Sequence, residues 1–460
     1  MKRFDAIILG AGQAGPPLCD RLTRAGMTVA LVERKLFGGT CVNTGCMPTK
    51  TLVASAYVAH LARRARDYGV LTEGPIRVDM ARVKTRADAI TSRQRASIEE
   101  WLRAMPGCTV LHGQAHFDGP NTIQVGSERL TAPSIFINVG GRAVVPDMPG
   151  VDRAPFLTNT TILALDRVPE HLVVIGGSYI GLEYAQMYRR FGARVTVVEK
   201  GDRLIGREDE DVSEAIRAFL EREDIQVRTG AECIRLEPVD NGVVVGVECA
   251  DGPPEVVGSH VLLAVGRRPN TDDLQLERAG IATDARGYIR VDDHLATNVA
   301  GVWALGDCNG RGAFTHTAYN DFEIVAANLL DGEDRKLSDR VPGYALYTDP
   351  PLGRAGMTER EARATGAPLL VGRRPMTRVG RAIERDETEG FMKIVVHAET
   401  RRILGAAILG VGGDEAIHGV LDIMSAGATA DALRWAVPIH PTVSELLPTL
   451  VVEMKPLDAG

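Results

Sequence analysis

The chain repeats one pattern, a strand, a glycine-rich turn, a helix and a second strand, at two places. In the first copy the apolar run 5–9 leads directly into the turn, and the next apolar run ends at Glu33. In the second copy the run 172–175 leads into a similar turn, and the next apolar run ends at Glu199. The first glycine of the turn and the acidic residue are 23 residues apart in both copies. This shared register predicts an α/β chain with two Rossmann-like βαβ units, each of the type that binds a dinucleotide.

The glycines of the two turns have separate tasks in such a unit. One allows the tight turn, one lets the backbone approach a pyrophosphate, and one lets the helix pack closely on the strand. The second copy has Ser178 at the middle position, where a side chain crowds the pyrophosphate, although Gly177 beside it keeps the turn flexible. An ordinary strand–helix turn is the alternative for either copy, and it has more weight for the second. The glycines are Gly10, Gly12 and Gly15 in the first turn and Gly176, Gly177 and Gly181 in the second.

Composition sets the broad class. A length of 460 residues suggests about three domains, and 45% apolar with 25% charged residues is ordinary for a globular protein. The net charge of −7, from 53 basic and 60 acidic residues, argues against nucleic-acid binding. The sequence has no uninterrupted apolar run of about 18 residues, so no membrane-spanning helix is expected. The seven cysteines do not suit a secreted disulfide scaffold, and we expect a cytoplasmic protein.

Cys41 and Cys46 lie five residues apart, shortly after the first acidic residue. In a regular helix this spacing separates the Cα atoms by roughly 8–9 Å, whereas a disulfide requires less than about 7 Å. A bond between them therefore needs a distorted segment, which Gly45 permits, and a helix that begins near Cys46 would favour a thiolate there. A zinc half-site or two unrelated buried cysteines are the alternatives. The remaining cysteines, expected to be small buried side chains, are Cys19, Cys108, Cys233, Cys249 and Cys308.

A second candidate group lies near the C-terminus. His440 is of the residue type that suits a base for thiol chemistry, and Glu445 is positioned to orient its imidazole. The alternative is a loop histidine beside a helix N-terminus that Ser444 or Thr442 caps. Catalysis gains weight because the cysteine pair needs a base, and no other histidine has a comparable carboxylate nearby in sequence.

Three segments together resemble one family. GGTCVNTGCMPTK (38–50), TNVAGVWALGD (297–307) and HPTVSE (440–445) are similar to the redox-active disulfide segment, the second FAD motif and the C-terminal base motif of the class I pyridine nucleotide-disulfide oxidoreductases. These flavoprotein disulfide reductases include glutathione reductase, dihydrolipoyl dehydrogenase and mercuric reductase. The resemblance extends from end to end. It implies two Rossmann-like dinucleotide-binding domains, a C-terminal α+β dimerisation domain, and a homodimer whose active site is shared between subunits.

The resemblance also implies a division of the chain. Residues 1–150 and 269–338 would form the FAD-binding domain, residues 151–268 the NAD(P)-binding domain, and residues 339–460 the dimerisation domain. An apolar strand ends in a glycine turn at 138–142, and another does so at 264–270. These two positions fit the ends of the two dinucleotide domains.

The resemblance implies roles for the candidate catalytic residues. Cys46 would face the flavin as a thiolate, and Cys41 would attack the substrate. His440, supported by Glu445, would reach across from the other subunit.

It likewise implies which residues bind the cofactors, and no metal is expected. Lys50 would lie near the flavin and pair with Glu183, and Tyr179 would cover the nicotinamide pocket. Glu33 would bind the FAD ribose, and Asp307 the ribityl or pyrophosphate portion. The expected cofactor-binding residues are Gly10, Gly12, Gly15, Glu33, Gly39, Thr40, Lys50, Gly140 and Asp307 for FAD, and Gly176, Gly177, Tyr179, Ile180, Gly181, Glu199 and Gly266 for NAD(H).

We therefore predict an FAD-dependent NAD(P)H:disulfide oxidoreductase. Electrons would pass from NAD(P)H through FAD to the Cys41–Cys46 disulfide and on to a small disulfide, or a dithiol would be oxidised in reverse. Glu199 favours NADH, because a carboxylate accepts a ribose hydroxyl and repels a 2′-phosphate. Lys200 and Arg203 could soften this preference, so NADP(H) remains an option.

The alternative function is an NAD(P)H-dependent metal-ion or quinone reductase of the mercuric-reductase-like type. Mercuric reductases carry a vicinal cysteine pair near the C-terminus, whereas the last cysteine here is Cys308. They also depart from the HPTxSE pattern that 440–445 keeps. A scaffold that keeps only the fold is a third option, but it has no use for the six candidate catalytic residues, which are Cys41, Cys46, Lys50, Glu183, His440 and Glu445. The physiological substrate and the direction of the reaction are not predicted.

Overall fold

The computed structural model describes residues 1–248 and 252–457. The first glycine-rich turn follows the central strand of a five-stranded parallel sheet with the order β18-β8-β2-β3-β4. One strand thus comes from a much later part of the chain than the other four. The strands are β2 (Ala6–Leu9), β3 (Val29–Glu33), β4 (Cys108–His112), β8 (Ser134–Ile137) and β18 (Val302–Ala304).

Strand β2 is buried on both faces, which explains why it is apolar without alternation. Ala6 and Ile8 pack with helices α1 (Gly15–Arg24) and α7 (Thr315–Ala326). Ile7 and Leu9 pack with a small second sheet of order β1-β7-β6-β5. The strands of that sheet are β1 (Lys2–Arg3), β5 (Ala115–Gly119), β6 (Thr122–Val125) and β7 (Glu128–Thr131).

The second glycine-rich turn follows β10, a central strand of a four-stranded parallel sheet with the order β12-β11-β10-β16. A three-stranded antiparallel sheet, β13-β14-β15, packs beside it. The elements are β10 (His171–Ile175), α5 (Tyr179–Phe191), β11 (Arg194–Val198), α6 (Glu210–Arg222), β12 (Ile225–Arg228), β13 (Glu232–Val239), β14 (Gly242–Glu248), β15 (Glu255–Gly258) and β16 (His260–Leu263).

The cysteine segment lies between these sheets. Helix α3 packs against α4 and α5, and Thr49 and Lys50 near its amino end contact Tyr184 and Glu183 of α5. A two-stranded ribbon, β9 with β17, also connects the two units. The elements are α2 (Gly39–Thr44), α3 (Cys46–Arg64), α4 (Met80–Ala104), β9 (Gly141–Ala143) and β17 (Arg267–Pro269).

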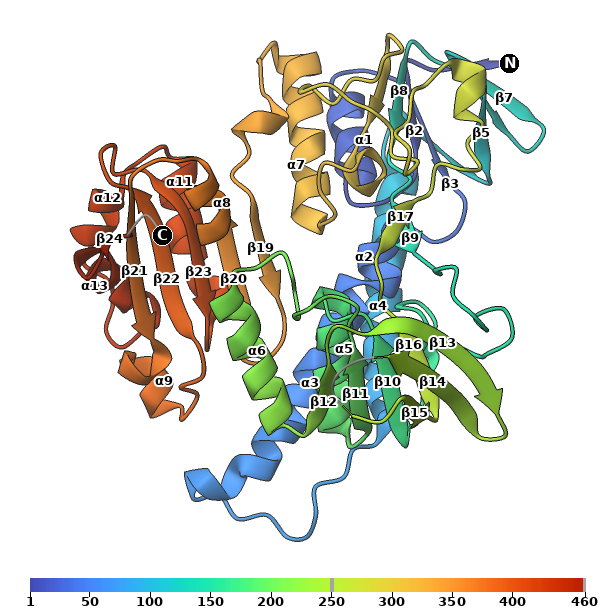
Figure 1. Ribbon diagram of the computed structural model, residues 1–460. Coiled ribbons are helices and arrows are strands. Elements are labelled where there is room, and N and C mark those ends of the chain that lie inside the picture. Colours follow the sequence, from blue (N-terminus) through green and yellow to red (C-terminus); the bar gives the residue numbers. More distant parts are fainter. Residues whose placement is uncertain (249–251, 458–460) are drawn as a thin grey trace.

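The C-terminal part forms an antiparallel sheet of order β19-β20-β23-β22-β21-β24 with short helices, an α+β arrangement. Figure 1 shows this sheet in orange and red beside the two parallel sheets. The elements are β19 (Gly343–Leu346), β20 (Leu352–Gly356), α8 (Glu359–Ala364), β21 (Leu369–Pro375), α9 (Gly380–Glu384), β22 (Phe391–His397), β23 (Ile403–Leu409), α10 (Gly413–Ala416), α11 (His418–Ser425), α12 (Ala430–Arg434), α13 (Leu447–Val452) and β24 (Lys455–Pro456).

Short helical turns complete the described chain. Seven are 3₁₀ turns and one, η5, is a π-helical turn. No helix among the described residues is long and apolar enough to cross a membrane. The turns are η1 (Ala65–Tyr68), η2 (Ile162–Ala164), η3 (Leu276–Ala279), η4 (Gly306–Asn309), η5 (Ala327–Asp331), η6 (Leu337–Asp339), η7 (Met376–Arg378) and η8 (Ser444–Leu446).

Candidate active site

The two close cysteines lie on either side of a break between two helices. Helix α2 ends at Thr44, helix α3 begins at Cys46, and Gly45 between them has φ −138° and ψ −121°, which is not helical. Cys41 and Cys46 are therefore not on one continuous helix, and their side chains are hydrogen-bonded to each other. Both are free thiols in this structure.

The two thiols differ in acidity. The hydrogen bond from Cys41 is the main reason why the pKa of Cys46 is lowered to about 6. Thr315, whose Oγ1 lies 3.3 Å from the Cys46 sulfur, and the positive charge of Lys50 act in the same direction, while burial opposes them. The same hydrogen bond, together with burial, raises the pKa of Cys41. At neutral pH the pair therefore consists of a Cys46 thiolate and a neutral Cys41 thiol.

An ion pair lies one turn further along α3. Lys50 Nζ donates to Glu183 Oε2 at 2.6 Å, and Glu183 on α5 is buried. The other carboxylate oxygen accepts the backbone N–H of Tyr347 at 3.1 Å, and the ring of Tyr347 lies 4.5 Å from the lysine nitrogen. Because a buried carboxylate is costly without partners, these contacts stabilise Glu183. Its negative charge raises the pKa of Cys46 and opposes the effect of Lys50.

The acidic residues at the ends of the two repeats are bound in the same way. The Glu33 carboxylate accepts the backbone N–H groups of Ala11 at 2.9 Å and Lys35 at 2.7 Å. Glu199 accepts two backbone N–H groups of its own unit, at 2.5 and 2.7 Å. Each carboxylate is thus fixed beside its glycine-rich turn, where a ribose of a dinucleotide would lie.

The turns themselves fit a pyrophosphate. A Cβ atom on Gly10 would lie 2.3 Å from the Asn138 carbonyl oxygen, and one on Gly181 would lie 2.0 Å from the Gly176 carbonyl oxygen. Strand, turn and helix therefore pack too closely for any larger residue. The residue before α5 makes no side-chain cap hydrogen bond, so backbone N–H groups of its first turn are free to bind an anion. The first turn of α1 differs, because Pro16 and Pro17 have no backbone N–H group.

The other predicted cofactor-binding residues lie around these turns. Gly39, followed by Thr40 in the first turn of α2, is so close to the first glycine-rich turn that a Cβ atom would lie 2.9 Å from the Gly12 Cα. Asp307 in η4 pairs with Arg267 at 3.3 Å. Gly140 and Gly266 flank the β9–β17 ribbon, and Ile180 is half-buried in the first turn of α5.

Tyr179 belongs to an aromatic cluster that sequence reasoning missed. Its ring meets those of Phe314 and Tyr344 edge-on, with centroids 6.4 and 5.6 Å apart. Phe314 also stacks on Tyr344 and His316, and the His316 ring accordingly packs in the cluster and contacts a backbone carbonyl at 2.7 Å. Phe314 directly precedes Thr315, which contacts Cys46. The cluster therefore lies between the second turn and the thiol pair.

His440 and Glu445 form a pair, with Nδ1 2.8 Å from Oε2. The His440 side chain is 81% exposed and that of Glu445 only 13%. Thr442 accepts the backbone N–H of Glu445 at 3.2 Å, whereas the residue directly before η8 is Val443, which makes no side-chain cap hydrogen bond. Among the described residues of one chain, His440 is not among the groups that act on the thiol pair.

The remaining cysteines differ from one another. Cys19 and Cys308 are buried, whereas Cys108 is half-buried and hydrogen-bonded to Cys19, a contact between elements distant in sequence that the spacing of the cysteines did not predict. The side chain of Cys233 and the whole of Cys249 lie outside the described part of the chain.

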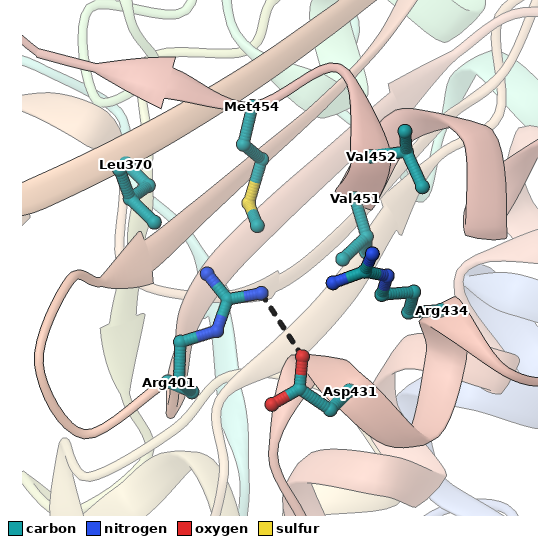
Figure 2. Close-up of a pocket in the computed structure, with 7 residues that line it drawn as sticks. All are labelled: Leu370, Arg401, Asp431, Arg434, Val451, Val452 and Met454. Carbon is teal, nitrogen blue, oxygen red and sulfur yellow. Dashed lines mark hydrogen bonds and ion pairs between the residues drawn. The ribbon is translucent and has the colours of Figure 1, made fainter.

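Two cavities lie near the C-terminal domain. One, of about 390 Å³, borders Lys50 and Glu183 and extends between α3, α5 and the segment around Tyr347. The other, of about 440 Å³, lies around the Arg401–Asp431 ion pair, and Figure 2 shows both side chains and Arg434 facing it. None of its lining residues belongs to the predicted site.

A dithiol of unequal acidity next to two dinucleotide turns defines a flavin- and nicotinamide-dependent oxidoreductase. Comparison with known proteins agrees. The chain belongs to the pyridine nucleotide-disulphide oxidoreductase family, whose sequence profile matches residues 4–321, and the dimerisation domain of that family matches residues 342–451.

Relatives span nearly the whole chain. It is 36% identical, over 99% of its length and 100% of the relative, to the probable pyridine nucleotide-disulfide oxidoreductase RclA of Escherichia coli. It is 33% identical to a dihydrolipoyl dehydrogenase of Thermus scotoductus, over 97% of this chain and 96% of the relative. It is 32% identical to a mercuric reductase of Streptomyces lividans, over 96% of this chain and 94% of the relative. The structure of the HOCl-induced flavoprotein disulfide reductase RclA in complex with Cu(II) superposes with a TM-score of 0.89 at 34% identity, covering 98% of this chain and 99% of that one.

The family confirms the predicted fold class, and it gives the activity. The chain is an oxidoreductase that uses FAD and NAD(P)H and acts on disulfides or dithiols. The mercuric-reductase-like alternative has no better support, since mercuric reductases are among the relatives at no higher identity than dihydrolipoyl dehydrogenases. The dimerisation domain indicates a homodimer.

Proposed function

We propose that electrons pass from NADH through FAD to Cys41 and Cys46, and from there to a small disulfide, with the reverse reaction on a dithiol. The observation that carries this proposal is the unequal thiol pair beside the Lys50–Glu183 ion pair. Bound FAD supplies the two-electron step between the nicotinamide and the cysteine pair. The glycine-rich turn at 10–15 with Glu33 would bind it.

The residues of the chain would divide the thiol chemistry. Cys46, whose thiolate is stabilised by Cys41, Thr315 and Lys50, would remain close to the flavin. Cys41 has a raised pKa, so it needs a base before it can attack a substrate disulfide. His440 is a suitable base, and its exposure supports a role in the active site of a second copy of the chain.

The Cys41→Ser variant tests the route through the cysteines. It keeps a hydroxyl donor beside Cys46 and cannot form the disulfide, so the FAD-loaded variant should show a long-wavelength charge-transfer band from the Cys46 thiolate. The Cys46→Ser variant is the control and should lack this band. If the Cys41→Ser variant binds FAD and shows no band at any pH, Cys46 does not face the flavin and the proposed route is wrong.

The preference for NADH rests on Glu199, which lies at the end of the second repeat with both carboxylate oxygens bound to backbone N–H groups. A fixed carboxylate accepts the ribose hydroxyls of NADH and repels the phosphate of NADPH. We expect kcat/KM to be at least about tenfold higher with NADH, and Glu199→Ala to reduce that ratio. An NADPH/NADH ratio well above one would contradict this assignment.

A second candidate substrate is a thiophilic metal ion, because solved relatives include a Cu(II) complex of the E. coli flavoprotein. The described residues contain no group of three or more His, Cys, Asp or Glu side chains arranged to bind a resident metal. Cu(II) would therefore be a substrate of the dithiol. NADH oxidation with lipoamide, glutathione disulfide, Cu(II), Hg(II) and quinones separates the candidates, and His440→Ala should abolish disulfide turnover while sparing metal or quinone reduction.

Three expectations remain proposals. The domain boundaries at residues 150, 268 and 338 follow from the sequence pattern and from the resemblance. The shared active site follows from the exposed base. The cytoplasmic location follows from the cysteine usage alone.

A further inference from the structure

A second pair of thiols lies in the first dinucleotide unit, apart from Cys41 and Cys46. Cys19 lies on α1, and Cys108 is the first residue of β4. Although the two residues are far apart in the sequence, their side chains are hydrogen-bonded to each other. The fold thus brings two sulfurs together at a second place in the chain.

The packing of α1 against the beginning of β4 produces this contact. A Cβ atom on Gly107, the residue before Cys108, would lie 3.4 Å from the Thr23 Cγ2 atom. Thr23 lies one helical turn beyond Cys19, and its Oγ1 donates to the Cys19 carbonyl oxygen at 2.9 Å. On the other side, the Gly107 carbonyl oxygen accepts the Val29 N–H at 2.9 Å, and both cysteines pack in one hydrophobic cluster. The two backbones are therefore held together by contacts that do not involve the sulfurs.

The two thiols differ in access and in acidity. Cys19 is 0% exposed, whereas Cys108 is half-buried. The hydrogen bond with Cys19 is the main reason why the pKa of Cys108 is lowered, and burial opposes it. The same hydrogen bond, together with burial, raises the pKa of Cys19. The more accessible thiol is thus the one that ionises more readily, so it meets an oxidant first, and its buried neighbour is placed to complete a disulfide.

We propose that Cys19 and Cys108 are a second redox-active dithiol, which a small disulfide converts into an intramolecular disulfide that fastens α1 to β4. The Cys108 thiolate attacks the small disulfide, forms a mixed disulfide and releases one thiolate. The Cys19 thiol then gives up its proton and attacks the Cys108 sulfur, and the second half of the small disulfide leaves as a thiol. Two protein thiols are thereby oxidised, and one small disulfide is reduced to two thiols.

The position of α1 gives this bond a consequence for FAD. Helix α1 begins at Gly15 in the first glycine-rich turn, and Cys19 lies one helical turn further along. A disulfide opposes local opening of the segments that it joins. A fastened α1 should therefore retain FAD longer under oxidising conditions. This consequence rests on the proposed function, because it assumes that the first turn binds FAD.

The test uses the FAD-loaded Cys41→Ser/Cys46→Ser double variant, which lacks the first pair of thiols. The reduced protein is freed of reductant, treated with glutathione disulfide, alkylated and digested with trypsin. Peptides 4–21 and 104–129, which contain Cys19 and Cys108, should be recovered as one disulfide-linked species. Its amount should exceed that in the untreated reduced protein at least about tenfold, and a reductant should abolish it.

Single substitutions added to the double variant separate the two steps. With Cys19→Ser the mixed disulfide cannot be resolved, so Cys108 should retain a glutathione adduct. With Cys108→Ser the buried Cys19 should stay unmodified. Cys308→Ser is the matched control, because Cys308 is a buried thiol that donates to the Ile137 and Leu305 carbonyl oxygens at 3.4 and 3.3 Å. The linked peptides should form in this control as before.

The release of FAD is a second readout that needs no turnover. In moderate urea, free-flavin fluorescence should appear at least about threefold more slowly from the oxidised double variant than from the reduced one, because α1 opens less readily. With Cys19→Ser added, the release rates before and after treatment with glutathione disulfide should be equal.

The outcomes separate the bond, its consequence and the proposed function. If both thiols stay free in the double variant, or if a stable adduct remains on Cys108 without linked peptides, the second redox-active dithiol is wrong. If the linked peptides form and FAD release is not slowed, the effect on FAD retention is wrong. A chain that binds no FAD contradicts the proposed function, and peptide mapping of the same protein still decides whether the second disulfide forms.

Discussion

At the scale of single residues, the site depends on an acidity difference between two identical side chains. Cys41 donates a hydrogen bond to the sulfur of Cys46, so the two thiols have different acidities. Thr315 lowers the pKa of both thiols, whereas the positive charge of Lys50 acts on Cys46, and no comparable cation acts on Cys41 among the described residues. The pair is therefore polarised before any substrate binds.

The hydrogen bond from position 41 should control the pKa of Cys46. Cys41→Ser retains a donor, so the charge-transfer band of the loaded variant should disappear as the pH falls through about 6. Cys41→Ala lacks the donor, and the midpoint should rise by about 1–2 pH units, because a hydrogen bond to a charged group contributes about 1.5–3 kcal/mol. Equal midpoints in the two variants would show that Lys50 and Thr315, rather than Cys41, stabilise the thiolate.

A second prediction concerns the positive charge of Lys50, which pairs with Glu183. Lys50→Met should lower NADH-dependent disulfide turnover at least about tenfold, because the cation near Cys46 is lost, and it should lower Tm, because buried Glu183 loses its partner. Adding Glu183→Gln should restore Tm without restoring turnover. Recovery of both in the double variant would mean that Lys50 serves only to neutralise Glu183.

At the scale of elements, the break between α2 and α3 brings the two sulfurs together. A continuous helix through 39–64 would separate Cys41 and Cys46 on different faces. Gly45 interrupts it, and the close approach of its Cα to the preceding turn leaves no room for a side chain, since a Cβ atom would lie 2.9 Å from the Thr40 carbonyl oxygen. The sequence spacing predicted such a distortion on the condition that the two cysteines bond to each other.

Gly45→Ala should therefore separate the thiols. The added methyl group contacts backbone atoms, which cannot rotate away, so α2 and α3 must shift apart. We expect at least about tenfold slower disulfide formation on exposure of the reduced protein to a small disulfide oxidant, followed by titration of free thiols. Gly419→Ala, in α11 with only an ordinary contact to Leu447 at 3.6 Å, is the matched control. Equal rates in both variants would show that the break tolerates a side chain.

Local patterns predicted the elements that are formed by neighbours in sequence. The 23-residue register identified β2, β3, β10 and β11 with their turns, because strand, glycine turn and helix each leave a local signal. The antiparallel sheet β13-β14-β15 and the Tyr179 cluster were not predicted. The members of the Tyr179 cluster lie far apart in the chain, for example Tyr179 and Phe314, and no short-range pattern encodes such contacts. The buried ion pair of Glu208 and Arg354 resembles surface charges in the sequence for the same reason. The strands of the β13-β14-β15 sheet, by contrast, are consecutive in the chain.

At the scale of the whole molecule, a single hydrophobic cluster joins the second unit to the C-terminal domain. Leu52 of α3 and Tyr184 of α5 pack in the same core as Leu352 of β20 and Leu409 of β23. The redox segment and the C-terminal sheet are therefore one packed body within a chain. The loop before His440 is different, because Trp435, Val437 and Ile439 are 75, 95 and 78% exposed. An apolar surface beside an exposed base fits burial against a second copy.

Complementation between inactive variants tests whether the active site is shared. Cys46→Ser lacks the thiolate and His440→Ala lacks the base, so each homodimer should be inactive toward disulfides. Coexpression of both chains should yield heterodimers, and each heterodimer contains one site with an intact Cys46 and an intact His440 from the opposite chain. If half of the dimers are mixed, the preparation should regain about a quarter of the unmodified activity, since each mixed dimer has one working site of two. The recovered activity should be zero if Cys46 and His440 of a site come from the same chain, because neither variant chain carries both residues intact.

Substituting Val437 with Glu in both chains should prevent the recovery of activity by disrupting the apolar contact, and FAD absorbance of the purified protein verifies that this variant still folds.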